Sequence, residues 1–175
     1  MSEVRTGIFD FRGQDAPVMG ADLKVGQGAP EFSAHNTEWQ EVNGLESTQG
    51  KVRIIGSLPS ISTSVCDRET RRFNVEAAAL SDEIAVLMVS MDLPYALRDW
   101  CAAAGIDRVV TLSDHRKGEF GEKYGVLLQN QRIFRRAIFV VDRGGKIVYA
   151  DYMKKLGDEP EYEQVIAAAR AALGN

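Results

Sequence analysis

The chain has 175 residues, a formal net charge of −4 and two cysteines. That length suits one domain with its own hydrophobic core, and a composition of 45% hydrophobic and 26% charged residues is that of a globular protein. Acidic and basic residues are interspersed, so the charge offers no patch for nucleic acid or an anionic membrane. No run approaches the ~18 apolar residues that a membrane helix needs. We therefore expect one globular domain over residues 1–175 that binds neither nucleic acid nor membrane.

The first 15 residues carry charge throughout and contain no apolar segment like that of a secretory signal. We therefore expect a cytoplasmic protein, in which disulfides are usually transient and catalytic rather than structural. Two cysteines in such a protein are either buried bystanders or a redox pair. Composition alone leaves both interpretations open.

The N-terminal part is punctuated by glycine and proline. Short apolar pieces alternate with Gly13 and Pro17 between residues 7 and 20, which predicts an N-terminal β-hairpin. Strands are expected near residues 32–36 and 39–42. From residue 52 the pattern alternates between β and α. The predicted elements are then, in chain order, a strand at 52–57, a helix from Ser64, a strand at 84–89, a helix from Pro94 to Gly105, a strand at 109–112, a short helix at 119–124 and a hairpin of strands at 137–141 and 146–150.

The last helix is predicted by its start and stop signals. Asp158 and Glu161 have the spacing of a capping box, and Gly174 follows an apolar stripe that ends at Leu173. Parallel βαβ units followed by a hairpin and a closing helix are typical of a thioredoxin-like α/β sandwich. We predict that fold, with an N-terminal β-hairpin added to it.

The two cysteines occupy opposite ends of their predicted helices. Cys66 falls in a first turn, where free backbone N–H groups and the positive end of the helix dipole favour a thiolate. Cys101 lies three residues before Ala104, near the end of its helix, where the dipole disfavours negative charge. Cys66 is therefore the candidate nucleophile, and Cys101 is the thiol that reacts second.

The helix alone is not enough to activate Cys66. A free thiol is only a few per cent thiolate at pH 7, and making it mostly thiolate requires roughly 3.4 kcal/mol. A helix terminus contributes ~0.3–1 kcal/mol, so a cation should also be nearby. Arg136, at the start of a predicted buried strand, is the best placed candidate, whereas we expect Arg132 and Arg135 to be solvated.

Two residues of the loop before Cys66 have two interpretations each. The hydroxyl of Thr63 could reach the thiolate or a bound peroxide oxygen, or it could simply cap the helix. Pro59 could stiffen the loop and shield the thiol from water, or it could be an ordinary loop proline. The local sequence leaves both pairs of interpretations open.

The segment at residues 59–66, Pro-Ser-Ile-Ser-Thr-Ser-Val-Cys, matches the active-site pattern of the peroxiredoxin family, in which Pro, three residues, Thr and two residues precede Cys. Further stretches resemble the bacterial thiol peroxidase branch of that family, at residues 70–74, 90–96, 100–105, 136–142 and 159–163. The resemblance covers nearly the whole chain, from Lys24 to the last helix. The sequence is therefore identified as a member of this family.

The resemblance implies an atypical two-cysteine peroxiredoxin that reduces hydrogen peroxide and organic hydroperoxides. It makes Cys66 the peroxidatic cysteine and Cys101 the resolving cysteine of the same chain. It makes Thr63 and Arg136 partners of the thiolate and the transition state, and places Pro59 beside them at the substrate. It also implies thioredoxin as the reductant and a homodimer. No metal, flavin or haem is needed for this chemistry.

The chain departs from the family pattern near both cysteines. Ser62 and Ser64 stand where Asp and Pro are common, which concerns the tuning of the loop and the dimer contact. Ala102 and Ala104 replace the more usual Gly and Glu, which concerns how readily that helix end unwinds. The pattern around the peroxidatic cysteine is otherwise intact, so we expect activity.

The expected cycle proceeds through a sulfenic acid on Cys66 and a disulfide with Cys101, which thioredoxin reduces. Because the two cysteines lie on successive helices with a strand between them, we expect both segments to unwind locally on oxidation. Alternatives are a static disulfide, a peroxide-sensing redox switch protein that uses the same cysteines, and a binding module with silent cysteines. A Cys-x-x-Cys reductase is excluded, because Glu69 occupies the third position after Cys66.

Overall fold

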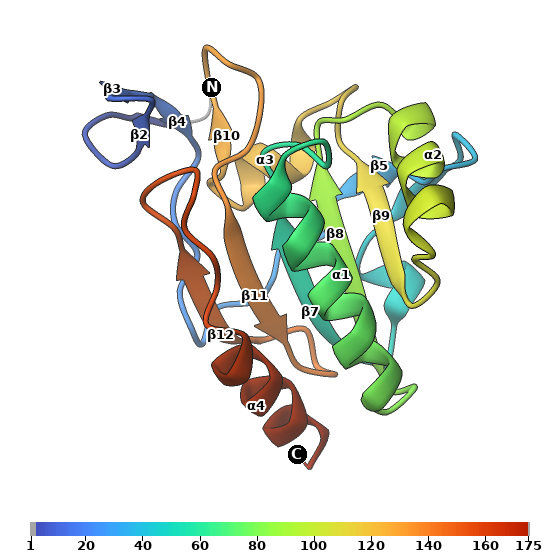
Figure 1. Ribbon diagram of the computed structural model, residues 1–175. Coiled ribbons are helices and arrows are strands. Elements are labelled where there is room, and N and C mark those ends of the chain that lie inside the picture. Colours follow the sequence, from blue (N-terminus) through green and yellow to red (C-terminus); the bar gives the residue numbers. More distant parts are fainter. Residues whose placement is uncertain (1–2, 175) are drawn as a thin grey trace.

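A seven-stranded sheet lies at the centre of the computed structural model, which describes residues 3–174 (Figure 1). Its strand order is β12-β11-β7-β8-β9-β5-β6. In that order the strands are Ile147–Tyr152, Ala137–Val141, Val52–Ser57, Ile84–Ser90, Val109–Ser113, Ser33–His35 and Glu41–Asn43. Strands β7, β8 and β9 are parallel neighbours, and the flanking strands pair antiparallel. This mixed sheet is that of the predicted thioredoxin-like sandwich.

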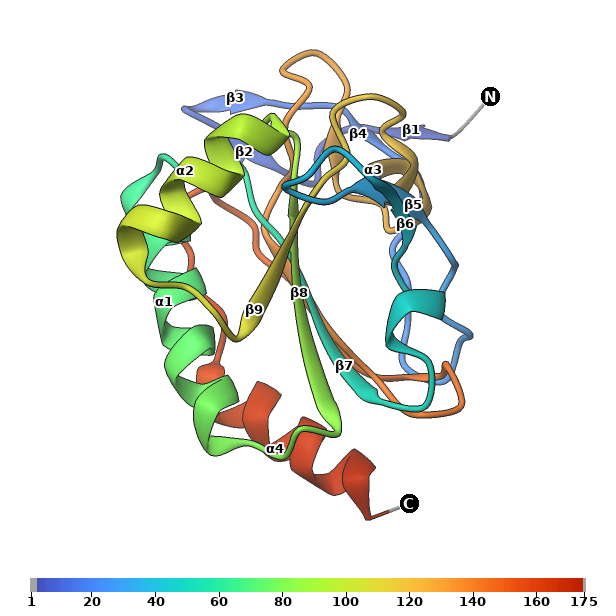
Figure 2. The same ribbon diagram turned by 90° about the vertical axis from the view of Figure 1, so that its right-hand side faces the viewer.

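Helices cover both faces of the sheet (Figure 2). One face carries α1 (Ser64–Ala79), α2 (Pro94–Ala104) and α4 (Tyr162–Leu173), and the other carries the short α3 (Glu119–Lys123). Because side chains alternate along a strand, Ile54 of β7 packs into the first core and Ile55 into the second. A 3₁₀ turn, η1 (Glu46–Thr48), follows β6. No helix within the described residues is both long and apolar enough to cross a membrane.

The helices that carry the cysteines begin where the sequence predicted. Helix α1 starts at Ser64, and α2 starts at Pro94. The predicted stop of α2 is also confirmed, because Gly105 has a φ of 66° and its N–H donates to the carbonyl of Cys101. Glycine adopts this left-handed conformation at little cost, and it therefore ends helices well.

The predicted capping box of the last helix is wrong. Glu161 is the N-cap residue of α4, and its side chain makes no capping hydrogen bond. Asp158 instead accepts hydrogen bonds from the backbone N–H groups of Lys154 and Lys155. The carboxylate closes the preceding turn, and this local bond competes with the capping role that the spacing indicated.

The predicted N-terminal hairpin is confirmed. Strand β2 (Asp10–Phe11) pairs antiparallel with β3 (Gln14–Asp15), and both turn residues, Arg12 and Gly13, have positive φ. Such a two-residue turn matches the twist of the strands that it joins. A separate three-stranded sheet brings the N-terminal part onto the domain, and it consists of β1 (Val4–Arg5), β4 (Val18–Met19) and β10 (Leu127–Leu128).

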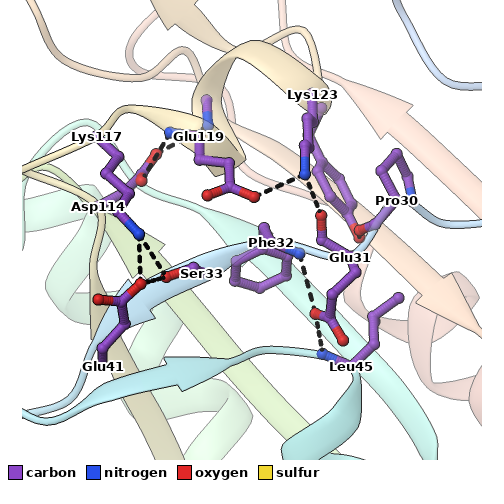
Figure 3. Close-up of polar contacts among 12 residues, drawn as sticks. Pro30, Glu31, Phe32, Ser33, Glu41, Leu45, Asp114, Lys117, Glu119 and Lys123 are labelled. Atoms are coloured by element: carbon purple, nitrogen blue, oxygen red, sulfur yellow. Dashed lines mark hydrogen bonds and ion pairs between the residues drawn. The ribbon is translucent and has the colours of Figure 1, made fainter.

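Polar contacts hold α3 and the turn before it close to strand β5 (Figure 3). Asp114, directly after β9, accepts hydrogen bonds from the backbone N–H groups of Glu119 and Gly121, each at 2.9 Å. Burial raises the pKa of this carboxyl to about 6. Lys123 donates to the carbonyl of Glu31 at 2.7 Å and so ties the helix to the start of β5. These contacts stabilise the face opposite to the helices that carry the cysteines.

Candidate active site

Cys66 lies at the start of α1, beyond the carboxyl end of strand β7. It is the third residue of the helix, so its N–H is one of the first four that have no acceptor within the helix. The side chain is fully buried in the core between α1 and the sheet. The loop that leads to it contains the buried Pro59 and the exposed Thr63.

Arg136 contacts the sulfur of Cys66. Its Nη2 donates to Sγ of Cys66 at 3.3 Å, and the arginine is completely buried. Arg136 directly precedes β11, which is the antiparallel neighbour of β7, so both residues reach the same edge of the sheet. A guanidinium at this distance can stabilise negative charge on the sulfur. The structure thus brings together the cysteine and the cation that sequence reasoning paired.

Glu69 belongs to the same cluster, and sequence reasoning missed it. It lies almost one helical turn after Cys66 and forms a fully buried ion pair with Nη1 of Arg136. Burial raises the pKa of this carboxyl to about 7, against the attraction of Arg136. The carboxylate fixes the guanidinium and also offsets part of its charge. The spacing of three residues from Cys66 was the available signal, because such residues share one helix face.

The hydroxyl of Thr63 does not point at the sulfur. It donates to the carbonyl of Ser60 at 3.0 Å, and although Thr63 is the N-cap residue its side chain makes no capping hydrogen bond. Its backbone carbonyl accepts from the N–H of Asp67 at 3.0 Å. A hydroxyl that donates still has lone pairs, so Thr63 can accept a hydrogen bond from a molecule outside the loop.

Asp92 holds the loop before α1. It follows β8, and its carboxylate accepts hydrogen bonds from the N–H of Ile61, the hydroxyl of Ser60 and the hydroxyl of Ser90, each at 2.8 Å. The loop is therefore tied to the end of the neighbouring parallel strand. Asp92 stands within a stretch that carries the family resemblance, but its role as an anchor is visible only in the three-dimensional arrangement.

Cys101 lies in the last turn of α2 and is partly buried. Its Sγ is 3.4 Å from Oγ1 of Thr111 on β9. Burial raises the pKa of this thiol, and the hydrogen bond with Thr111 acts in the opposite direction. Both cysteines are free thiols, and they contact different partners. A disulfide between them therefore requires movement away from the arrangement seen here.

The model of the AhpC/TSA family matches residues 25–150. This chain belongs to the AhpC/TSA family. It is 47% identical to a thiol peroxidase of Bacillus subtilis over 161 residues, which cover 92% of this chain and 95% of that protein. It is 45% identical to a thiol peroxidase of Oceanobacillus iheyensis over 157 residues, which cover 90% and 94% of the two chains.

Solved structures agree with this membership of the AhpC/TSA family. A peroxiredoxin-like protein from Aquifex aeolicus is 32% identical, with a TM-score of 0.85 and coverage of 95% of this chain and 98% of that one. A thiol peroxidase from Chromobacterium violaceum, 20% identical, shares the fold with a TM-score of 0.81 and coverage of 95% and 97%. The family and the fold predicted from the sequence are both confirmed.

The expectation that Arg135 is solvated is wrong for this AhpC/TSA protein. Arg135 is buried, and its guanidinium donates to the carbonyl of Gly125 and pairs with Asp22. The ring of Tyr152 lies 4.3 Å from the same guanidinium. Since successive side chains alternate along extended backbone, Arg135 and Arg136 serve opposite faces of the sheet. Arg132 is exposed, as predicted.

A depression in the surface lies beside the first turn of α1. Its lining includes Ile61, Thr63, Asp67 and Trp100, which come from the loop, from α1 and from α2. Cys66 is fully buried and is not part of this lining. The depression therefore lies between the anchored loop and the two helices that carry the thiols.

Proposed function

We propose that this protein is a thiol-dependent peroxidase that reduces hydrogen peroxide and organic hydroperoxides. The observation that carries the proposal is the guanidinium of Arg136, 3.3 Å from the buried sulfur of Cys66 at the start of α1. Membership of the AhpC/TSA family and the thiol peroxidases among the relatives support the same chemistry.

In the first step, the thiolate of Cys66 attacks an oxygen of the peroxide. The S–O bond forms as the O–O bond breaks, which leaves a sulfenic acid on Cys66 and, after protonation of the leaving oxygen, releases water or an alcohol. Arg136 and the free N–H groups of the first helical turn stabilise the negative charge that develops. Thr63, whose hydroxyl already donates to Ser60, accepts the hydrogen bond of the peroxide O–H. Pro59 shields the sulfur from water.

In the second step, Cys101 resolves the sulfenic acid. Its sulfur forms a bond with the sulfur of Cys66, the S–O bond breaks, and water leaves. Thioredoxin then reduces the disulfide by thiol exchange. The two cysteines of this step are both reduced in the structure and lie on neighbouring helices on the same face of the sheet.

The proposal includes a homodimer in the cytoplasm, where thioredoxin supplies the electrons. Light scattering on the purified protein tests the dimer, for which we expect twice the mass of the 19.3 kDa chain. A mass of 19.3 kDa at working concentration would show that the dimer is not formed.

The decisive experiment follows peroxide consumption with thioredoxin, thioredoxin reductase and NADPH. We expect turnover by the wild type, none by Cys66→Ser, and a single turnover without recycling by Cys101→Ser. Full activity of Cys66→Ser would falsify the assignment. Slow consumption by the wild type, together with rapid oxidation of Cys66, would instead favour a peroxide-sensing switch.

A further inference from the structure

A hydrogen bond joins the neighbour of Cys66 directly to the neighbour of Cys101. Nε1 of Trp100 donates to Oδ1 of Asp67 at 2.9 Å. Asp67 lies in the first turn of α1, and Trp100 lies near the end of α2. The contact therefore ties together the two stretches of helix that hold the thiols.

Arg71 reinforces this contact from the next turn of α1. Its Nε donates to the other carboxylate oxygen of Asp67 at 2.9 Å, and its guanidinium lies 5.6 Å from the ring of Trp100. Its Nη1 also donates to the carbonyl of Ala104, at 3.3 Å, at the end of α2. The hydrogen bond with Arg71 lowers the pKa of Asp67, so this carboxyl is ionised at neutral pH. An ionised acceptor makes the bond to the indole stronger.

The two sulfurs have different hydrogen-bond partners, Arg136 for Cys66 and Thr111 for Cys101. A disulfide requires Cα atoms about 4.4–6.8 Å apart with their Cβ atoms facing each other. Each sulfur is held by a partner of its own, so we expect the start of α1 and the end of α2 to change backbone conformation when the disulfide forms. Asp67 and Trp100 are covalent neighbours of the two cysteines, so the contact between them is strained or broken in that change.

We propose that Asp67 and Trp100 form a latch that keeps Cys66 within its helix during attack on the peroxide and sets the rate of the resolving step. The latch rests on the proposed function and adds two positioning residues to it. Once the latch opens, Cys101 condenses with the sulfenic acid of Cys66 and water leaves. While it is closed, a second peroxide can transfer an oxygen to the sulfenic acid, which yields sulfinic acid and water or an alcohol. The latch thus sets the ratio of disulfide to sulfinic acid.

Three substitutions separate the parts of the latch. Trp100→Phe removes the donor but keeps an aromatic ring, and Asp67→Ala removes the acceptor. Asp67→Asn keeps an oxygen that can accept from the indole but loses the charge that binds Arg71. Asp99→Ala is the matched control, because Asp99 is the exposed neighbour of Trp100 and pairs with Arg98 at the surface.

Rapid chemical quench followed by intact-mass measurement counts the disulfide and the sulfinic acid at increasing peroxide concentration. We expect Trp100→Phe and Asp67→Ala to form the disulfide about two- to tenfold faster than the wild type, the effect of losing one hydrogen bond. Both should accumulate correspondingly less sulfinic acid. Asp67→Asn should stay closer to the wild type, and Asp99→Ala should match it.

Tryptophan fluorescence provides an independent readout, because the chain has two tryptophans and Trp39→Phe leaves Trp100 alone. In that background the emission should change together with disulfide formation and not with the earlier formation of sulfenic acid. Adding Asp67→Ala should shift the emission of the reduced enzyme toward that of the oxidised enzyme. An emission change that accompanies the sulfenic acid step would contradict the latch.

An unchanged or slower resolving step in both Trp100→Phe and Asp67→Ala overturns the latch. The latch is also overturned if the rates of disulfide and sulfinic acid formation and the melting temperature all fall with no change in the ratio of the two products. That pattern indicates a packing role alone. If the wild type itself forms no disulfide with peroxide, the proposed function fails, and the latch fails with it.

Discussion

The guanidinium of Arg136 lies 3.3 Å from the sulfur of Cys66, although 70 positions separate the two residues in the chain. Strands β7 and β11 are antiparallel neighbours, so the segment that follows β7 and the residue that precedes β11 bring both side chains to one buried place. The other terminal nitrogen of this guanidinium, Nη1, donates to the carboxylate of Glu69. One cation is therefore shared between a thiol and a carboxylate, and this sharing governs the first two predictions.

Replacing Arg136 by lysine should impair the peroxidase. A lysine keeps the charge but cannot contact Glu69 and Cys66 at the same time with a planar fork. We expect kcat/KM for hydrogen peroxide to fall by about 10²–10³, the usual effect of losing one preorganised donor. Alkylation of Cys66 by iodoacetamide at pH 7 should fall less, because the charge remains. Arg132→Lys, at an exposed position of the same segment, is the control. A change in kcat/KM of less than twofold for Arg136→Lys would contradict the role of Arg136 in the reaction.

Replacing Glu69 by glutamine should change how stability depends on pH. Burial raises the pKa of Glu69 from 4.5 to about 7 in the folded protein, so the unfolded chain releases this proton first. The contribution of Glu69 to the free energy of unfolding therefore falls as pH rises from about 4.5 to about 7 and is constant above that range.

Urea denaturation of the wild type and Glu69→Gln between pH 5 and pH 8 tests this prediction. The wild type should lose stability relative to Glu69→Gln between pH 5 and about 7, and the difference should then stay constant up to pH 8. Glu38→Gln, at an exposed position, should follow the wild type. Parallel curves for the wild type and Glu69→Gln would show that Glu69 ionises at the same pH in the folded and unfolded chains.

Replacing Asp92 by asparagine should loosen the active-site loop. Two oxygens of Asp92 accept the N–H of Ile61 and the hydroxyls of Ser60 and Ser90, whereas asparagine has one oxygen and an amide that repels donors. We expect kcat/KM for peroxide to fall about tenfold, as expected for the loss of one or two hydrogen bonds to a charged group. Steady-state kinetics measure this, with Asp99→Asn as a control on the exposed face of α2. Unchanged kinetics would mean that the loop keeps its shape without the carboxylate.

The pKa of the Cys101 thiol should lie above its ordinary value. Burial raises its pKa, and the hydrogen bond from Thr111 opposes the rise. Because the thiolate is the reactive form, alkylation of Cys101 in the Cys66→Ser variant should keep accelerating above pH 9, beyond the midpoint of the urea-unfolded protein. Thr111→Val removes the opposing bond and should move the midpoint further up. A midpoint equal to that of the unfolded protein would exclude this account.

The local elements of the fold could be predicted because their signals lie within a few residues of each other. The helical spacing of apolar residues after Ser64 predicted one helix start, and Pro94 and Gly105 marked the start and the end of the next helix through their backbone preferences. The capping box at Asp158 and Glu161 was wrong, because the Asp158 side chain found backbone donors in the preceding turn. Such a choice between two local partners depends on the path of the chain.

By itself the sequence determined the family and the thioredoxin-like fold, and it predicted a ranking of the two cysteines, because motif spacing and helix polarity are properties of short segments. Only the tertiary structure decided which side chains meet across elements. It paired Glu69 with Arg136, buried Arg135, anchored the loop on Asp92 and joined Asp67 to Trp100. These contacts link residues on different helices, strands and loops, and their geometry follows from how the layers pack. The position of Cys66 in the first turn of a helix therefore follows from the local sequence, whereas its contact with Arg136 and the latch between Asp67 and Trp100 follow from the tertiary fold.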